Sequence, residues 1–509
     1  MADKDNLIKI EKWLKEKKYI SHLSSDSRNI SEGDVFMAFK GKKFDGRDFI
    51  LNAINSGAKT ILFDPIGNFR WDKAWEVDCL AVPNLSSLAG KIASNWYSIP
   101  EKPVLYVGIT GTNGKTSCSH WIAQALSKKN IPSAVIGSLG VGQYFLNQKP
   151  KFKKINCTTP NAVLLNRFIA KLKLKGSKAI VIEASSIGID QGRIDTLKFE
   201  IAVFTNLSHD HMDYHSSMSR YELVKRKLFE WPSLKHAVIN VDDPAGKRLI
   251  LFLKEKRPKV NLISYSLKDT ENTSVSKIIA KDIRINQKGT SFTICISKET
   301  ENIKSLLIGD FNISNILAVS GVLSALKFSL PQIKRAIESL SNVEGRLEQI
   351  GGQNTPLIII DYAHTPDAMK KVLKNLRKIS DLRNGKLWCV FGCGGNRDSK
   401  KRSKMGKVSQ MADSLVITSD NPRNENLEKI ISDIVIGIKN QSKDHFHIIH
   451  DRGVAILFSI RNASKNDVVL IAGKGDEEFQ EVKGKKYPFR DYDHASMALA
   501  SRSSQIGDH

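Results

Sequence analysis

The 509-residue chain lacks several features that mark large classes of protein. No apolar stretch approaches the length needed to cross a bilayer, and the first residues, MADKDNLIKI, lack the apolar segment of a signal peptide. There is no internal repeat and no low-complexity tract, while apolar (41%) and charged (26%) residues are near ordinary globular usage. We therefore expect a cytoplasmic protein of several globular domains, without membrane insertion.

Cysteine is also sparse. The six cysteines are scattered, and they are Cys79, Cys118, Cys157, Cys295, Cys389 and Cys393. Only Cys389 and Cys393 are close in sequence, and no second pair is present to complete a zinc site. We expect free thiols in a reducing compartment.

Acidic residues are fewer than basic ones: the chain has 53 Asp and Glu against 78 Lys and Arg, which gives a net charge of +25. Such a charge raises the hypothesis of a nucleic-acid partner. The lysines are spread along the chain, however, and we find no RNA-binding aromatic motif, zinc finger or helix-turn-helix signature. Solvated lysine-rich faces explain the charge better, and a positive field also suits small anionic substrates.

A glycine-rich stretch, GITGTNGKTS (108–117), indicates a nucleotide site. It differs by one residue from the common phosphate-binding loop, because Ile109 stands where the first glycine is expected. An apolar strand precedes it and a helix follows, so Gly111 and Gly114 can turn N–H groups toward phosphates. Lys115 adds a cation and Thr116 a hydroxyl for Mg²⁺. The alternative is an ordinary strand-to-helix turn with a solvated lysine.

Short runs of β-branched residues, which are typical of strands, divide the chain into regions. Residues 1 to about 100 are a mixed segment that ends near two prolines, Pro100 and Pro103, which mark a linker. From Val104 to about Asn342 the runs SAVIGS, KAIVIEAS, IAVFTNL and HAVIN alternate with amphipathic segments. That alternation predicts a mostly parallel α/β sheet.

The last third predicts a doubly wound domain. Its five apolar runs are PLIIIDYA, KLWCVFGCGG, DSLVITSDNPR, HFHIIHDR and DVVLIAGKGDE, separated by helix-length stretches. Ligands of such sheets bind beyond the carboxyl ends of the strands. The polar residues at those ends are Asp361, Arg397, Asp420 to Arg423, and Glu477.

Two further residues follow strands of the middle region. Glu183 ends one apolar run, and His211 lies just after another, in TNLSHDHMDYH. A carboxylate and an imidazole beside a phosphate loop suit Mg²⁺ bound to ATP. A His-rich loop is equally compatible with a hydrogen-bonded turn.

Taken together, GTNGKT, TNLSHDHMDYH, YELVKRKLF, GDFNISN, EGRLE, DYAHTPDA, FGCGGNRD, DNPR and AGKGDE resemble the motifs of the muramyl peptide (Mur) ligases. The motifs stand in the family's order over nearly the whole chain, most like those of its diaminopimelate-adding members. The resemblance implies three domains: 1–102 for a UDP-sugar, 103–342 as a central P-loop-like ATPase, and 343–509 as a Rossmann-like amino-acid-binding domain.

The resemblance also assigns residues to ATP and to a catalytic metal. The positions that match ATP-binding residues are Gly111, Thr112, Asn113, Gly114, Lys115, Thr116, Ser117, Asn312, Arg346 and His364. The metal positions are Thr116, Glu183, His211 and Lys225, and catalysis falls to Lys115, Glu183, His211 and Lys225. Lys225 matches a lysine that relatives carry as a CO₂-derived carbamate, which turns a cation into an anionic oxygen donor. By composition alone, Lys225 would be a solvated helix lysine.

Two more sets of residues follow from the resemblance. For the UDP-sugar substrate they are Ser25, Ser27, Lys42, Lys43, Phe44, Thr158, Thr159, Ser185, Gln191 and Arg193. For diaminopimelate they are Arg397, Asp420, Asn421, Pro422, Arg423, Gly473 and Glu477. A buried Arg423 would grip the carboxylate that diaminopimelate has and lysine lacks.

Three residues depart from the family pattern: Cys157 replaces Asn, Ile187 replaces His, and Asp476 replaces His. They leave the implied chemistry intact but put single substrate contacts in question.

The implied activity is ATP-dependent addition of meso-diaminopimelate to UDP-N-acetylmuramoyl-L-alanyl-D-glutamate through an acyl phosphate, in peptidoglycan synthesis. We expect a monomer that uses ATP, Mg²⁺ and small-molecule substrates, with no nucleic acid. The alternatives are an L-lysine-adding muramyl ligase, a folylpolyglutamate synthetase, and a nucleic-acid-dependent P-loop ATPase.

Overall fold

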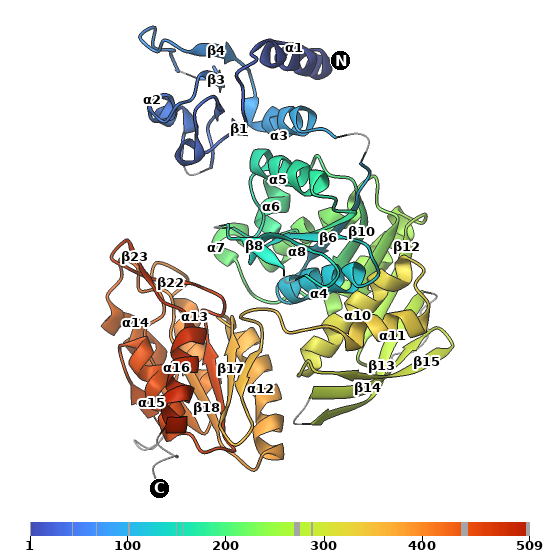
Figure 1. Cartoon of the computed structure of the whole chain (residues 1–509), viewed down its shortest axis with the longest axis vertical. Helices are drawn as coiled ribbons and strands as arrows, with labels where there is room; N and C mark the ends of the chain where they lie inside the picture. Colours follow the sequence, from blue (N-terminus) through green and yellow to red (C-terminus); the bar gives the residue numbers. More distant parts are fainter. Residues whose placement is uncertain are drawn as a thin grey trace. The chain divides into compact units, whose positions relative to one another are not determined.

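The computed structural model describes residues 2–42, 44–67, 69–99, 102–148, 150–155, 157–268, 275–286, 289–438 and 446–504 (Figure 1). The chain forms two compact units. One comprises Met1–Thr110, Leu126–Ala202 and Tyr221–His236, and the other Gly111–Ala125, Val203–Arg220 and Ala237–His509. Within the described ranges, no helix is both long and apolar enough to cross a membrane. Pro100, one of the two linker prolines, lies outside the described residues, and the division into three domains stays a prediction.

The amino-terminal region contains a four-stranded parallel sheet in the order β1-β2-β3-β4. Its elements are α1 (Ala2–Glu16), β1 (Leu23–Ser24), β2 (Val35–Ala38), α2 (Ile50–Asn55), β3 (Thr60–Phe63), β4 (Asp78–Ala81) and α3 (Leu85–Trp96). Side chains alternate along β2: Val35 and Met37 pack with α1 and α3, while Phe36 and Ala38 pack with α2. The sheet is therefore covered on both faces.

The largest sheet has eleven strands in the order β15-β14-β13-β12-β11-β10-β5-β9-β6-β7-β8. These strands are β5 (Leu105–Thr110), β6 (Ser133–Gly137), β7 (Gly140–Tyr144), β8 (Lys151–Lys153), β9 (Ala179–Glu183), β10 (Phe199–Phe204), β11 (His236–Asn240), β12 (Asn261–Ser266), β13 (Ser276–Asn286), β14 (Gly289–Ile296) and β15 (Glu299–Ser305). The predicted strands at β5, β6, β9, β10 and β11 are confirmed, as is the α/β class.

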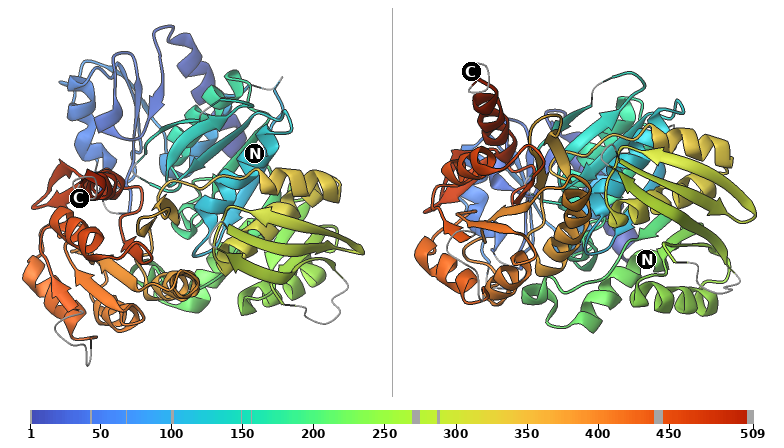
Figure 2. Two further views of the ribbon diagram at one scale, coloured as in Figure 1. Left: turned by 60° about the horizontal axis from the view of Figure 1, so that its bottom comes forward. Right: turned by 90° about the horizontal axis from the view of Figure 1, so that it is seen from below.

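Both edges of this sheet are antiparallel, which the sequence did not predict. Strands β6, β7 and β8 form a meander at one edge, and β13, β14 and β15 form another. Figures 1 and 2 show β13 to β15 beside the helices α10 (Asp310–Ala325) and α11 (Leu330–Glu338). The tight turn between β14 and β15 has Ser297 in the left-handed region, with φ of 56°. Serine is a less obvious marker of such a turn than glycine or asparagine.

The remaining helices of this middle part follow the expected alternation. They are α4 (Lys115–Ser127), α5 (Ala162–Leu174), α6 (Ser186–Asp190), α7 (Met212–His215), α8 (Met218–Arg226) and α9 (Pro244–Lys256). The α4 helix begins directly after the glycine-rich loop, as predicted.

The carboxyl-terminal sheet has the order β16-β17-β21-β18-β19-β20, and all its pairings are parallel except that of the edge strand β16. Its strands are β16 (Glu348–Gly351), β17 (Leu357–Asp361), β18 (Leu387–Phe391), β19 (Ser414–Ile417), β20 (Phe446–Ile448) and β21 (Val468–Ala472). The five predicted strands are confirmed.

Helices cover both faces of this sheet, which confirms the doubly wound prediction. The helices α12 (Pro366–Leu382), α13 (Lys400–Ser409) and α14 (Leu427–Val435) pack on one face. The helices α15 (Arg452–Asn462) and α16 (Asp491–Ser504) pack on the other. Because Asp361 and Phe391 both pair with Ala472, the strands β17, β18 and β21 end at one edge, where ligands of such sheets bind. A short hairpin, β22 (Phe479–Val482) and β23 (Lys485–Pro488), follows β21.

Candidate active site

The glycine-rich loop joins β5 to α4, and two of its glycines are sterically required. Gly111 has φ of 149°, and a Cβ there would collide with Thr205 Oγ1. A Cβ on Gly114 would lie 2.5 Å from Asn315 Oδ1. Larger residues would therefore push the loop away from its neighbours.

The loop is held by the segment that follows β10. Asn206 accepts hydrogen bonds from the N–H groups of Thr112 and Asn113, both at 2.9 Å, through its carbonyl and side-chain oxygens respectively. Thr205 Oγ1 donates to the Asn113 carbonyl at 2.6 Å. Thr205 and Asn206 were not among the predicted site residues, although TNLS directly precedes the His-rich motif. Their role is to fix the shape of the loop.

Lys115 folds back over its own loop. Its ammonium donates to the carbonyl oxygens of Gly111 and Thr112, each at 2.9 Å. Thr116 and Ser117 are buried in the first turn of α4, whose amino-terminal dipole favours an anion. Asn312 is buried in α10, where its amide donates to the Ile308 carbonyl at 2.9 Å. The loop thus combines a helix amino terminus with a cation, as a phosphate site requires.

His211 and Asp210 follow the segment that supports the loop. His211 has φ of 55°, its side chain is 45% exposed, and its Nε2 lies 3.5 Å from Asp210 Oδ2. Burial alone would raise the pKa of Asp210, but the neighbouring His211, His364 and Lys115 together lower it. Burial and the Lys401 ammonium lower the pKa of His364, whose Nδ1 lies 2.9 Å from the Tyr362 carbonyl oxygen. Asp210 of the His-rich motif therefore lies close enough to His211 and to His364, a predicted ATP residue of the same unit, for their charges to interact.

Glu183 ends β9 with its side chain fully buried. Its two carboxylate oxygens accept hydrogen bonds from the backbone N–H of Ser138 at 3.0 Å and from Ser138 Oγ at 3.1 Å. Ser138 Oγ also lies 3.0 Å from Thr158 Oγ1, which ties the predicted metal ligand to a predicted substrate residue. Sequence reasoning missed Ser138, whose only signal is its place directly after the strand SAVIG.

The predicted substrate residues near Glu183 form one network. Thr159 Oγ1 donates to the Glu183 carbonyl at 2.7 Å and lies 2.8 Å from Ser185 Oγ. Arg193 donates to the Thr159 carbonyl at 2.6 Å and, through two of its nitrogens, to Gln191 Oε1 at 3.0 and 2.7 Å. The structure therefore brings Thr158, Thr159, Ser185, Gln191 and Arg193 together.

The predicted substrate residues of the amino-terminal region differ in their exposure and in how close they lie to this network. Lys42 lies 3.2 Å from Asp190, the residue before Gln191, so it is close to that network. Phe44 is 72% exposed, and Ser25 and Ser27 are half-buried with no side-chain hydrogen bond to the network. Lys43 lies outside the described residues.

Lys225 lies in α8 and is only 2% exposed. Its ammonium sits 4.3 Å from the centre of the Tyr221 ring, one helical turn earlier, in a cation–π contact. Burial rules out the solvated helix lysine that composition suggested.

The donors present suit Mg²⁺. In the described part of the chain, no group of three or more His, Cys, Asp and Glu side chains forms a ready-made metal cluster. Magnesium is usually held by one or two carboxylates, with waters and substrate phosphates as its other ligands. The fixed carboxylate of Glu183 and the hydroxyl of Thr116 are hard oxygen donors of this kind, so the chemistry fits a metal that arrives with a nucleotide.

Arg346 links three motifs of the carboxyl-terminal region. Its guanidinium packs 4.5 Å from the centre of the Tyr362 ring and lies 3.2 Å from Asp476. A Cβ on Gly345 would be 2.7 Å from the Gly475 carbonyl carbon, so these loops pack backbone to backbone. Asp476, one of the three departures, is thus the ion-pair partner of a predicted ATP residue.

Asn421 and Glu477 meet beyond the ends of β19 and β21. Asn421 Nδ2 donates to Glu477 Oε2 at 2.7 Å, and a fully buried lysine, Lys474, donates to the same oxygen at 2.7 Å. Asp420 is close to Gly473, whose Cβ would lie 2.7 Å from Asp420 Oδ2, and Pro422 is buried beside them. The structure brings these predicted residues together, and Lys474 is the partner that the prediction missed.

The two arginines predicted to bind diaminopimelate differ in their exposure and contacts. Arg397 is exposed. Arg423 has φ of 53°, donates to the Gly395 carbonyl at 2.8 Å and lies 3.3 Å from Glu481, with 23% of its side chain exposed. The expectation of a buried Arg423 is wrong: its backbone pairs with β22 of the β22–β23 hairpin, through hydrogen bonds with Glu481 and Lys483, and its side chain stays partly exposed.

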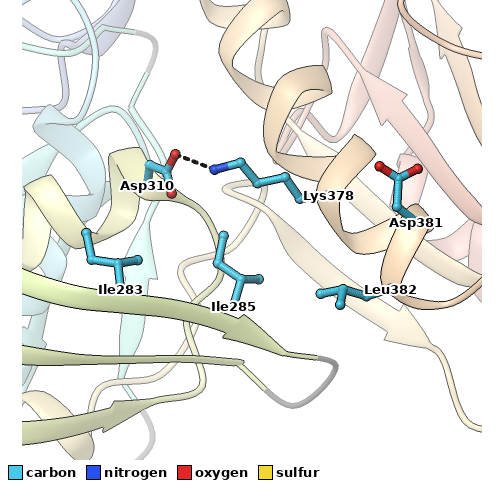
Figure 3. Close-up of a pocket in the computed structure, with 6 residues that line it drawn as sticks. All are labelled: Ile283, Ile285, Asp310, Lys378, Asp381 and Leu382. Carbon is cyan, nitrogen blue, oxygen red and sulfur yellow. Dashed lines mark hydrogen bonds and ion pairs between the residues drawn. The ribbon is translucent and has the colours of Figure 1, made fainter.

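A cavity of about 480 Å³ is lined by residues that the sequence did not predict as site residues (Figure 3). Its walls are Ile283 and Ile285 of β13, Asp310 of α10, and Lys378, Asp381 and Leu382 of α12. Lys378 and Asp310 form an ion pair at 2.8 Å across it. The Asp310 N–H donates to Asn375 Oδ1 at 2.9 Å, so the start of α10 is anchored to α12 two residues before Asn312.

The six cysteines are free, as expected.

A phosphate loop beside a parallel sheet, followed by a doubly wound region with polar strand ends, defines an α/β nucleotide-dependent enzyme. Three family models match the chain: "Mur ligase family, catalytic domain" over residues 19–97, "Mur ligase middle domain" over 109–323, and "Mur ligase, glutamate ligase domain" over 345–475. The chain belongs to the Mur ligase family.

Named relatives are similar over nearly the whole length. A UDP-N-acetylmuramoyl-L-alanyl-D-glutamate–2,6-diaminopimelate ligase of Janthinobacterium sp. (strain Marseille) is 47% identical over 499 residues, covering 98% of each chain. A solved structure of a ligase of that name is 31% identical, with a TM-score of 0.64 and 95% of each chain covered. A MurF ligase from Thermotoga maritima in complex with ADP shares the fold at 19% identity, with a TM-score of 0.65 and 96% and 99% coverage.

Proposed function

We propose that this chain is an ATP-dependent ligase that adds meso-diaminopimelate to UDP-N-acetylmuramoyl-L-alanyl-D-glutamate. The observation that carries the proposal is the 47% identity, over 98% of both chains, to a relative named for that reaction. The grouping of the predicted substrate residues around Glu183, and of Asn421 and Glu477 at the strand ends, supports it.

In the proposed reaction, ATP phosphorylates the γ-carboxylate of D-glutamate and releases ADP. An amine of diaminopimelate then attacks the acyl phosphate, loses a proton and displaces phosphate, which leaves an amide. Lys115 is suited to stabilise the charge of the transferring phosphoryl group once it turns from its own loop toward ATP. The residues around Thr159 and Arg193 would hold the nucleotide substrate.

We further propose that Mg²⁺ is held by Thr116, Glu183, His211 and a carbamate on Lys225, and that it neutralises charge on the phosphates. The carbamate would form when the neutral Lys225 amine attacks CO₂ and loses a proton. The burial of Lys225 supports this role, because a carbamate in a site closed to water is protected from exchange with solvent.

Arg423 and Glu477 would recognise the carboxylate and the ammonium at the end of diaminopimelate that does not form the new amide. The partial exposure of Arg423 agrees with a donor that a ligand can still reach. We expect the enzyme to work as a cytoplasmic monomer on small molecules.

A substrate panel tests the proposal. Purified protein is incubated with ATP, Mg²⁺, the UDP-muramyl dipeptide and one amino acid at a time, and products are identified by mass spectrometry. We expect UDP-muramyl tripeptide with diaminopimelate, together with ADP and phosphate. Preferential use of L-lysine, or ATP hydrolysis stimulated by polynucleotide alone, would contradict it.

A further inference from the structure

Lys474 is a lysine with no exposed surface, in the loop that follows β21. Its ammonium has three hydrogen-bond acceptors: Glu477 Oε2 at 2.7 Å, the Phe479 carbonyl at 2.7 Å, and Asn421 Oδ1 at 3.2 Å. An ammonium has three protons, so this shell is complete. A buried charge with a full set of partners is costly to disturb.

The backbone around Lys474 turns its side chain inward. Gly473 and Gly475 both have positive φ, at 113° and 54°. Their missing side chains let the loop lie against Asp420 on one side and Tyr362 on the other. The loop is thus shaped so that the lysine between two glycines is enclosed.

The network leaves one carboxylate oxygen of Glu477 unused. Asn421 Nδ2 and Lys474 Nζ both donate to Oε2, while Oε1 makes no hydrogen bond with any described residue. Asn421 Oδ1 is also occupied, by Lys474 and by the Glu481 N–H at 2.8 Å. Asn421 is therefore bound to the protein on its acceptor side, and Glu477 is held by one oxygen with the other available.

We propose that Lys474 is a positioning residue for amino-acid recognition. It fixes Glu477 by one oxygen, so that the second oxygen can accept the ammonium of the incoming diaminopimelate, and it keeps Asn421 in the orientation that braces Glu477. The inference rests on the proposed function.

The test is Lys474→Met, which keeps most of the apolar stem and removes the three donors. We expect the KM for diaminopimelate to rise about tenfold or more, in keeping with the strength of charge-assisted hydrogen bonds. The KM values for ATP and the nucleotide substrate should change less than about twofold, because the proposed function assigns Glu477 to diaminopimelate and not to those substrates. Lys485→Met, at an exposed lysine of β23, is the matched control and should behave as the parent.

A double-mutant cycle separates positioning from simple packing. If Lys474 acts through Glu477, then Lys474→Met combined with Glu477→Gln should have a diaminopimelate KM near that of the worse single variant. Independent losses that multiply would overturn the proposal. If the Met variant does not fold, Lys474→Gln retains a donor and should raise the same KM by a smaller factor.

An unchanged diaminopimelate KM in a folded Lys474 variant, with the parent active, overturns this inference alone. A parent that does not use diaminopimelate overturns the proposed function as well.

Discussion

Gly137 is the residue whose replacement tests the role of Glu183 most directly. It is the last residue of β6, and a Cβ built there would lie 2.8 Å from Glu183 Cγ and 2.5 Å from Cδ, with Oε1 closer still. The glycine thus leaves room for the buried carboxylate. Gly137→Ala alters no chemical group of the proposed site, yet it must displace the proposed metal ligand.

The size of the displacement follows from the contact distances. Ordinary contact begins at 3.4 Å, so the carboxyl carbon must move by about 0.9 Å. Magnesium requires oxygen ligands at about 2.0–2.1 Å in near-octahedral geometry, and a misplacement of about 1 Å can reduce a rate about 10²-fold. The shift would also break the hydrogen bonds from Ser138, at 3.0 and 3.1 Å. We expect kcat to fall about 10²-fold and the Mg²⁺ concentration for half-maximal rate to rise.

The assay is phosphate release at saturating substrates over a series of Mg²⁺ concentrations, with thermal unfolding measured in parallel. Gly176→Ala is the control: its methyl group meets nothing within 4 Å, while its φ of 87° makes alanine unfavourable. That variant should lose some stability and keep its activity. If Gly137→Ala has the kcat and Mg²⁺ response of the parent, then Glu183 is not a metal ligand.

Three other variants probe the proposed site. Lys225→Ala should nearly abolish turnover and partly recover when a short-chain carboxylate is added, whereas full activity without it would exclude the carbamate. Arg423→Ala should reduce the preference for meso-diaminopimelate over L-lysine, measured as a ratio of kcat/KM values. A preference equal to that of the parent would remove Arg423 from recognition. Asp476→Asn should raise the KM for ATP about fivefold or more by releasing Arg346 from a half-buried ion pair at 3.2 Å, with the diaminopimelate KM as the internal control. Equal rises in both KM values would argue against a specific link between Asp476 and ATP.

The strands of the central and carboxyl-terminal sheets could be predicted because local sequence determines them. Runs such as LIIID and VVLIA are apolar on both faces, as the buried strands β17 and β21 require, and each is followed by polar or glycine residues. The antiparallel edges were missed for the opposite reason. Strand β15 reads ETENIKS, a polar segment whose pairing with β14 becomes clear only from the register.

Residue identity at the site was likewise easier to predict than the contacts that support it. Glu183 was identifiable as a carboxylate at a strand end, but its hydrogen-bond donor, Ser138, is 45 residues away in sequence. Asp476 was visible as a departure from a family pattern, yet its partner Arg346 is 130 residues distant. Lys474 stands inside a recognised motif, but only its burial and its hydrogen bonds to Asn421, Glu477 and Phe479 show that it points inward rather than to solvent. Motifs identify groups that can do chemistry. The partners that orient those groups come from segments far away in the sequence, and a local motif does not show which distant segments pack against it.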